Sequence, residues 1–136
     1  MKTTNYFNTF IAVSEDCPTA LSEAPPVKAA KKTVANIQFD LIYDNPYKFS
    51  SDEVLFSVFE SKNEISAKEL EEEKSRFFSK GQACFRSSPL TKRYGWGVHF
   101  NNEGKMAIYG VDSLEYQRFK KDPSLKQIRA MRSKKV

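Results

Sequence analysis

The stretch that decides the fold reads Trp96-Gly97-Val98-His99-Phe100-Asn101-Asn102-Glu103-Gly104-Lys105-Met106-Ala107-Ile108-Tyr109. Apolar side chains alternate with small or polar ones on both sides of a four-residue turn that ends in Gly104. Period-two alternation interrupted by a turn of Asn and Gly is typical of a β-hairpin. The sequence therefore predicts two antiparallel strands in this part of the chain.

Two more strands are expected outside the hairpin, one over residues 6–13 and one over residues 82–85. Residues 34–43 are ambiguous, because they alternate like a strand and also place Val34 and Leu41 on one helical stripe. Thr33 is a suitable N-cap for the helical alternative, which we slightly favour.

Helices are marked by short capping motifs in the middle and at the end of the chain. Ser50-x-x-Glu53 and Ser66-x-x-Glu69 are capping boxes, and the second predicts a helix beginning at Ala67 that ends near Gly81. Asp112-x-x-Glu115 opens a short helix that ends before Pro123. Ser124-x-x-Gln127 predicts a last helix through Met131.

These elements predict a single compact α+β domain with a small, mainly antiparallel sheet and several covering helices. We assign this domain to residues 1–123 and treat residues 124–136 as a basic C-terminal helix or tail. The net charge of +5 comes from the last part of the chain, because residues 118–136 are strongly basic and residues 1–117 are slightly acidic. A uniformly basic nucleic-acid-binding domain has a different charge distribution.

The chain has two cysteines, Cys17 and Cys84, which is sparse for a small secreted domain and leaves a single bridge as an alternative. Neither a secretory signal nor an apolar run long enough to span a bilayer is visible. We therefore expect a cytoplasmic protein that does not enter a membrane. The sequence predicts no metal site and no cofactor, since it lacks paired histidines and a Cys-x-x-Cys motif.

Residues 86–99 form the segment richest in functional groups, and we call it the 86–99 segment. Pro89 predicts a loop over residues 87–92, where cations and hydroxyl groups can bind a phosphate or a carboxylate. A solvated connection between strands is the alternative interpretation. The candidate ligand-binding residues are Arg86, Ser87, Ser88, Thr91, Lys92, Arg93 and Trp96.

His99 and Tyr94 are the candidate catalytic residues of the 86–99 segment. Strand alternation places His99 on the same face as Gly97 and Gly95, which leave room for a ligand or another backbone. A histidine beside such a space can act as an acid or a base, and a hydrogen-bonded structural histidine is the alternative. A Ser88–His99–Asp112 triad can be written down, but no Gly-x-Ser-x-Gly motif supports it.

A resemblance to a known family is carried by residues 45–56, the 86–99 segment and residues 130–134. Through them the chain resembles an uncharacterised bacterial family, the domain of unknown function 6157. The similarity extends over nearly the whole chain, and the run Ser-Ser-Pro-Leu-Thr-Lys-Arg-Tyr-Gly-Trp-Gly is its most specific part. The resemblance implies a stand-alone bacterial protein, and it brings no catalytic residue or ligand with it.

Three functions are compatible with these features. The first is a binding module that captures an anionic group, a nucleotide or a nucleic-acid phosphate, through the 86–99 segment. The second is a small enzyme that uses His99 as acid or base, with Tyr94 and Arg86 stabilising charge. The third is an adaptor that binds a protein partner through the basic tail or the acidic helix. The sequence leaves the oligomeric state open.

Overall fold

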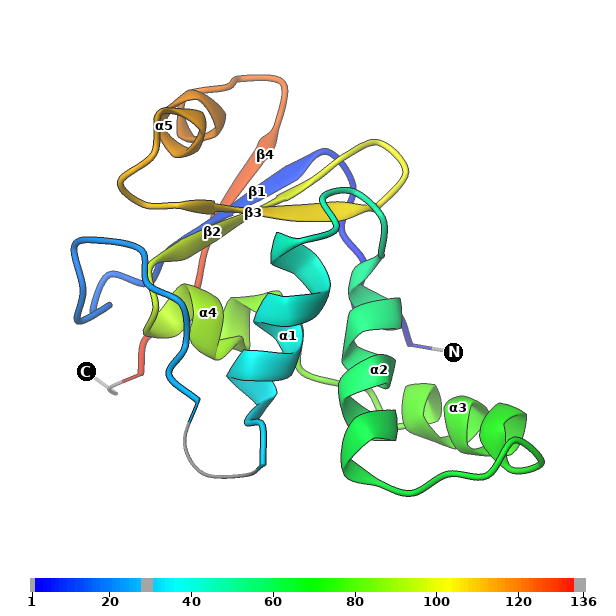
Figure 1. Cartoon of the computed structure of the whole chain (residues 1–136). Coiled ribbons are helices and arrows are strands. Elements are labelled where there is room, and N and C mark those ends of the chain that lie inside the picture. The colour runs from blue at the N-terminus through cyan, green and yellow to red at the C-terminus, as the bar shows by residue number, and fades with distance from the viewer. Residues whose placement is uncertain (1, 28–30, 134–136) are drawn as a thin grey trace.

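The computed structural model of the chain describes residues 2–27 and 31–133 and confirms an α+β protein (Figure 1). In chain order its elements are β1 (Thr9–Ala12), α1 (Val34–Tyr43), α2 (Ser51–Lys62), α3 (Leu70–Ser79), the 3₁₀ turn η1 (Phe85–Ser87), α4 (Pro89–Lys92), β2 (Trp96–Phe100), β3 (Met106–Gly110), α5 (Leu114–Lys120) and β4 (Lys126–Arg129).

Within the described residues, four strands form one sheet in the order β3-β2-β1-β4. β2 runs antiparallel to both β1 and β3, and the second of these pairs is the predicted hairpin. β4 runs parallel to β1, so the sheet is mixed but mainly antiparallel. The strands at its two edges are therefore β3 and β4.

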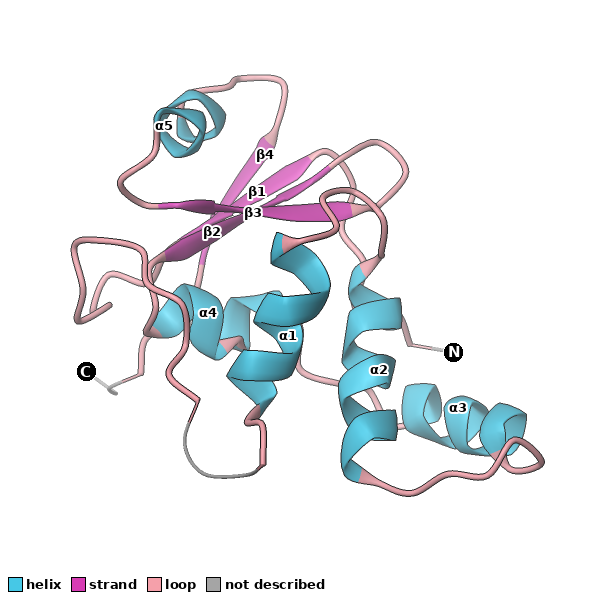
Figure 2. Ribbon diagram, viewed as in Figure 1, coloured by secondary structure: helices cyan, strands magenta, loops and turns pink. Residues whose placement is uncertain are grey.

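The two faces of the sheet are covered unequally. Figure 2 shows α1, α2 and α4 below the sheet and the short α5 alone above it. The larger core lies on the first side, where strand residues such as Ile11, Val98 and Phe100 pack with Phe85 and Leu90. The smaller core lies under α5 and contains Phe10, Ala12 and Tyr116.

Two of the predicted caps hold in the structure. Thr33 and Asn36 form a reciprocal capping box at α1, which settles residues 34–43 as a helix, and Ser50 and Glu53 form another at α2. The third prediction needs a correction, because α3 begins at Leu70 rather than at Ala67 and has no side-chain cap. A hydrogen bond from Glu69 N to Ser66 O closes a turn there instead, and this exposed end has little packing to extend the helix.

The prediction of a strand at residues 82–85 is wrong. Residues 81–84 are irregular, and η1 begins at Phe85. The predicted loop over residues 87–92 is also largely helical, because Ser88 caps α4 and Pro89 occupies its first turn. α5 begins at Leu114, with Ser113 rather than Asp112 as its N-cap.

The predicted helix after Ser124 is wrong as well, because Lys126–Arg129 forms strand β4. β1 offers a row of backbone groups on this side, and pairing with it outweighs the local helix signal. Ala130, next after β4, is buried in the larger core, so this segment is part of the sheet. Residues 134–136 of the predicted tail lie outside the described residues, as do residues 28–30 of the irregular segment before α1.

Both cysteines, Cys17 and Cys84, are free thiols. Within residues 2–27 and 31–133, the structure contains no helix with the length and apolar character that a membrane crossing requires.

Candidate functional site

The serine and threonine hydroxyl groups of the 86–99 segment are used in hydrogen bonds within the protein. Ser88 is buried, donates to Gln38 Oε1 at 2.6 Å and caps α4. Thr91 is fully buried and donates to the carbonyl oxygens of Phe85 and Ser88 at 3.0 Å. These two side chains fix the short helical connection and face away from solvent.

The cations of this segment lie at the surface and do not surround a common cavity. Arg86 donates from Nε to the backbone oxygen of Arg129 at 2.8 Å, and it thereby supports the end of β4. Ser87 contacts the sulfur of Met131 in the same region. Arg93 is exposed and Lys92 is partly buried.

His99 lies on the opposite face of the sheet, half-buried beneath α5. Its ring stacks on Phe119 with centroids 4.1 Å apart, and its Nδ1 lies 2.7 Å from the Tyr47 hydroxyl. Burial lowers the pKa of His99, and the nearby Asp122 opposes this effect. Tyr94 packs against the larger core on the other side, so the two candidate catalytic residues are not brought together.

The space predicted beside Gly97 is occupied. A methyl group at Gly97 would lie 2.6 Å from both Phe10 Cζ and Tyr116 Cε2. The glycine therefore makes room for the Tyr116 ring, which fixes α5 to the sheet, and the tyrosine hydroxyl accepts a hydrogen bond from Val13 N at 3.0 Å. Aromatic packing, rather than a ligand, explains this small residue on β2.

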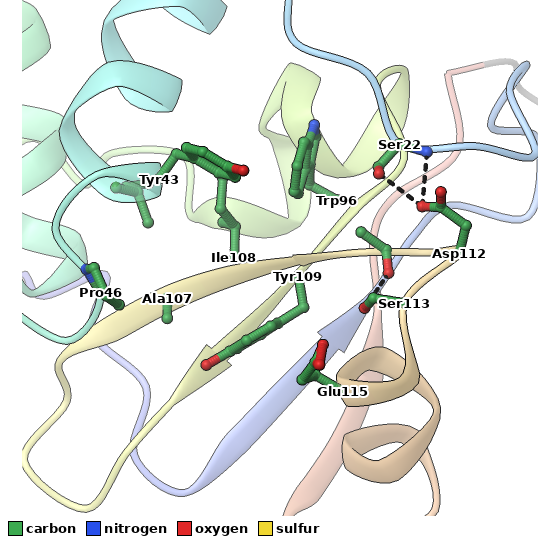
Figure 3. A pocket seen from close by; sticks show the side chains of 12 residues that line it. Ser22, Tyr43, Pro46, Trp96, Ala107, Ile108, Tyr109, Asp112, Ser113 and Glu115 are labelled. Carbon is green, nitrogen blue, oxygen red and sulfur yellow. Dashed lines mark hydrogen bonds between the residues drawn. The ribbon is translucent and has the colours of Figure 1, made fainter.

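Among the candidate residues, Trp96 lines a cavity that is formed by the described part of the chain. This cavity, about 470 Å³ in volume, lies against the outer edge of β3, and we call it the edge cleft. Figure 3 shows Tyr43, Trp96 and Ile108 on one side of β3, with Tyr109 and Glu115 on the other.

The upper wall of the edge cleft is aromatic. Tyr43, the last residue of α1, is 52% exposed and stacks on Phe39 at 4.8 Å. Trp96 meets the Tyr43 ring edge to face at 5.5 Å, and its indole nitrogen donates to Glu23 O at 2.8 Å. Three aromatic rings thus hold one another in place, and the Tyr43 ring remains accessible to a ligand.

The opposite end of the edge cleft carries carboxylates. Asp112 Oδ1 accepts from the Ser22 hydroxyl at 2.7 Å and from the Ser22 backbone N–H at 3.1 Å. These hydrogen bonds lower the pKa of Asp112, so its carboxylate stays charged at neutral pH. Glu115 of α5 adds a second carboxylate. None of the lining residues, all of which belong to the described part of the chain, is Lys or Arg.

Sequence reasoning missed this site because its residues are dispersed along the chain. Ser22, Tyr43, Ile108 and Asp112 come from four separate segments, and only the folded chain brings them around β3. The available signal was limited to Trp96, the only tryptophan of the sequence.

The fold and the cleft define a small α+β protein with a cavity that borders a sheet edge. The sequence profile described as "Family of unknown function (DUF6157)" matches residues 1–136, the whole chain. The chain therefore belongs to this family. Comparisons with curated proteins and with solved structures gave no match.

Proposed function

We propose that the chain is a binding protein whose ligand occupies the edge cleft and combines an apolar or aromatic group with a positive charge. One observation carries this proposal: the exposed Tyr43 ring and two carboxylates line one cavity, and none of its described lining residues is basic. A volume of about 470 Å³ lies in the range typical of small-molecule and peptide sites.

Three sources of negative potential favour a cation. Asp112 is held in its charged form by Ser22, and Glu115 lies on the neighbouring helix. The C-terminal end of α1, which carries Tyr43, contributes the negative end of a helix dipole. A cation near the exposed Tyr43 ring gains a further contribution from the electron-rich face of the aromatic ring.

The enzyme hypothesis loses support from the position of His99. Its ring lies between the sheet and Phe119 of α5, in contact with Tyr47. A catalytic acid or base has to reach the reacting group of a bound substrate, and this ring is stacked beneath a helix instead. We therefore do not propose acid–base catalysis by His99.

The experiment uses Trp96 as a built-in fluorescent reporter, since it lines the edge cleft and is the only tryptophan. The protein is titrated with phenethylamine and with phenylacetate, two probes that share the ring and differ in charge. We expect the amine to change Trp96 emission in a saturable way and the acid to have no such effect.

The variant Asp112→Asn combined with Glu115→Gln should remove the preference for the amine. Glu103→Gln is the matched control, because Glu103 is an exposed carboxylate in the hairpin turn away from the cleft. Equal or stronger binding of phenylacetate to the unmodified protein would contradict the proposal.

Anion capture is a second proposal with narrower support. Arg86 and Arg93 are both exposed, so their guanidinium groups are accessible to a phosphate, although the hydroxyl groups expected beside them are turned inward. Unchanged binding to a panel of nucleotides and RNA after Arg86→Ala plus Arg93→Ala would dismiss it. We further propose that the protein is bacterial and cytoplasmic. The two free thiols support a cytoplasmic location, because cysteines stay reduced in that compartment.

A further inference from the structure

The outer edge of β3 has backbone groups at the edge cleft that no described residue of the chain binds. Met106 N donates to Phe49 O at 2.9 Å, and Met106 O accepts from Tyr47 N at 2.8 Å, so the backbone of Met106 faces away from β2. In an antiparallel pair this direction repeats every second residue. The N–H and C=O groups of Ile108 therefore also face outward, into the edge cleft.

The two neighbouring positions on this edge are occupied, but Ile108 is not. Segment 47–49 pairs with Met106, and the Ser113 N–H and hydroxyl both donate to Gly110 O. Within the described part of the chain, no residue bonds to the backbone N–H or C=O of Ile108. An open strand edge of this kind is a template for the addition of another strand.

Resting on the function proposed above, we infer that the ligand is a short extended peptide that adds to β3 as an antiparallel strand. Its central residue forms two backbone hydrogen bonds with Ile108. Residues directly opposite in such a pair project to the same face of the sheet, so this central side chain lies with Ile108 on the aromatic side near Tyr43 and Trp96.

The residues before and after the central one project to the other face, where Tyr109 and Glu115 lie. Lysine or arginine is favoured there because Glu115 supplies a carboxylate on that face and none of the described lining residues of the cleft is basic. The peptide thus has a basic–apolar–basic pattern. The part of the peptide that can pair with β3 is limited to a few residues. Segment 47–49 closes one end of the strand edge, and Ser22 with Asp112 closes the other.

The probe is the synthetic peptide acetyl-Val-Lys-Val-Lys-Val-amide, with binding followed by Trp96 fluorescence and by the NMR shift of the Ile108 amide. We expect saturable binding, and no binding of the peptide in which Glu replaces both Lys. Methylation of the central Val nitrogen should weaken binding about tenfold, because it removes a hydrogen bond to β3. Methylation of the backbone nitrogen of one Lys should leave binding unchanged, because this nitrogen faces away from β3 into solvent.

The variant Glu115→Gln should weaken binding of the Lys peptide about threefold, in keeping with a partly exposed ion pair. Glu103→Gln again serves as the matched control. Equal sensitivity to methylation at both nitrogens, or none at either, overturns the peptide inference.

The remaining outcomes separate this inference from the function on which it rests. If phenethylamine binds and the Lys peptide does not, the inference fails and the proposed function stands. If neither binds, both fail. Self-association of the protein that competes with the peptide overturns the inference too, because the occupant is then a second copy, whose basic strand β4 has the matching charge.

Discussion

At the scale of single residues, His99 shows how a chemically versatile side chain becomes structural. Its ring is enclosed by Phe119 and hydrogen-bonded to Tyr47, whose hydroxyl also lies 3.0 Å from the Tyr109 hydroxyl. Burial and the Tyr109 contact raise the pKa of Tyr47, so its hydroxyl stays protonated. The Tyr47 hydroxyl therefore links the His99 ring to the Tyr109 hydroxyl.

Protonation of His99 should reduce stability in mildly acidic solution. Burial holds its pKa in the folded chain below the ordinary value of 6.5, against a smaller opposing effect of Asp122. The unfolded chain then binds more protons than the folded chain below about pH 6.5, so the free energy of unfolding falls as the pH drops from there to the folded pKa. Denaturant unfolding across this range should show the loss, and His99→Gln should remove it.

The pKa itself can be measured by NMR, because the sequence has one histidine. Phe119→Ala exposes the ring and should shift the pKa of His99 back toward 6.5. A pKa at or above 6.5 in the unmodified protein would show that burial does not control this group.

Residue patterns predicted the start of a helix correctly where the cap and the backbone group that it binds are close in the sequence. Thr33 and Ser50 were identified as caps because a hydroxyl and a nearby backbone N–H are enough to start a helix. The interpretation of Gly97 was less successful. Sequence shows that a side chain is missing there, but only the fold shows that the Tyr116 ring fills the space.

At the scale of elements, α2 and α3 provide a direct comparison of two identical motifs. Ser50 accepts from Glu53 N at the start of α2 and is 8% exposed, whereas Ser66 is exposed and lies outside α3. The same Ser-x-x-Glu pattern therefore caps one helix and leaves the other uncapped.

Replacement of the two serines should have different effects. Ser50→Ala removes a working cap and should lower the free energy of unfolding by about 1 kcal/mol. Ser66→Ala should change it by less than about 0.5 kcal/mol, as is usual for surface substitutions. Urea unfolding of the two variants measures this difference, and equal losses would restore Ser66 as the cap of α3.

At the scale of the whole molecule, β4 is the element that sequence reasoning could not find. Its four residues are mostly exposed, so they show no apolar alternation, and its partner β1 lies near the other end of the chain. The edge cleft could not be predicted either, because its walls come from segments that are distant in the sequence. The hairpin and the helices capped by Thr33 and Ser50 were predictable because their signals lie within one short stretch.

Removal of residues 126–136 should therefore unfold the protein rather than remove a tail. The deletion exposes the edge of β1 and removes Ala130 from the larger core. We expect cooperative thermal unfolding, followed by circular dichroism, to be lost. Lys126→Gln plus Arg132→Gln is the control, because it removes exposed charges and keeps the strand. An unchanged unfolding midpoint after the deletion would show that β4 is dispensable.

The parallel pairing of β1 with β4 also orders events during synthesis. β1 emerges from the ribosome first among the described elements, and its partner β4 emerges last. While the intervening helices and the hairpin are made, β1 therefore lacks its parallel partner β4. Contacts between such distant segments form slowly, and open strand edges associate with other chains in the meantime. The sheet is therefore completed only after β4 has been made, whereas the hairpin of β2 and β3 can pair as soon as its two strands are available.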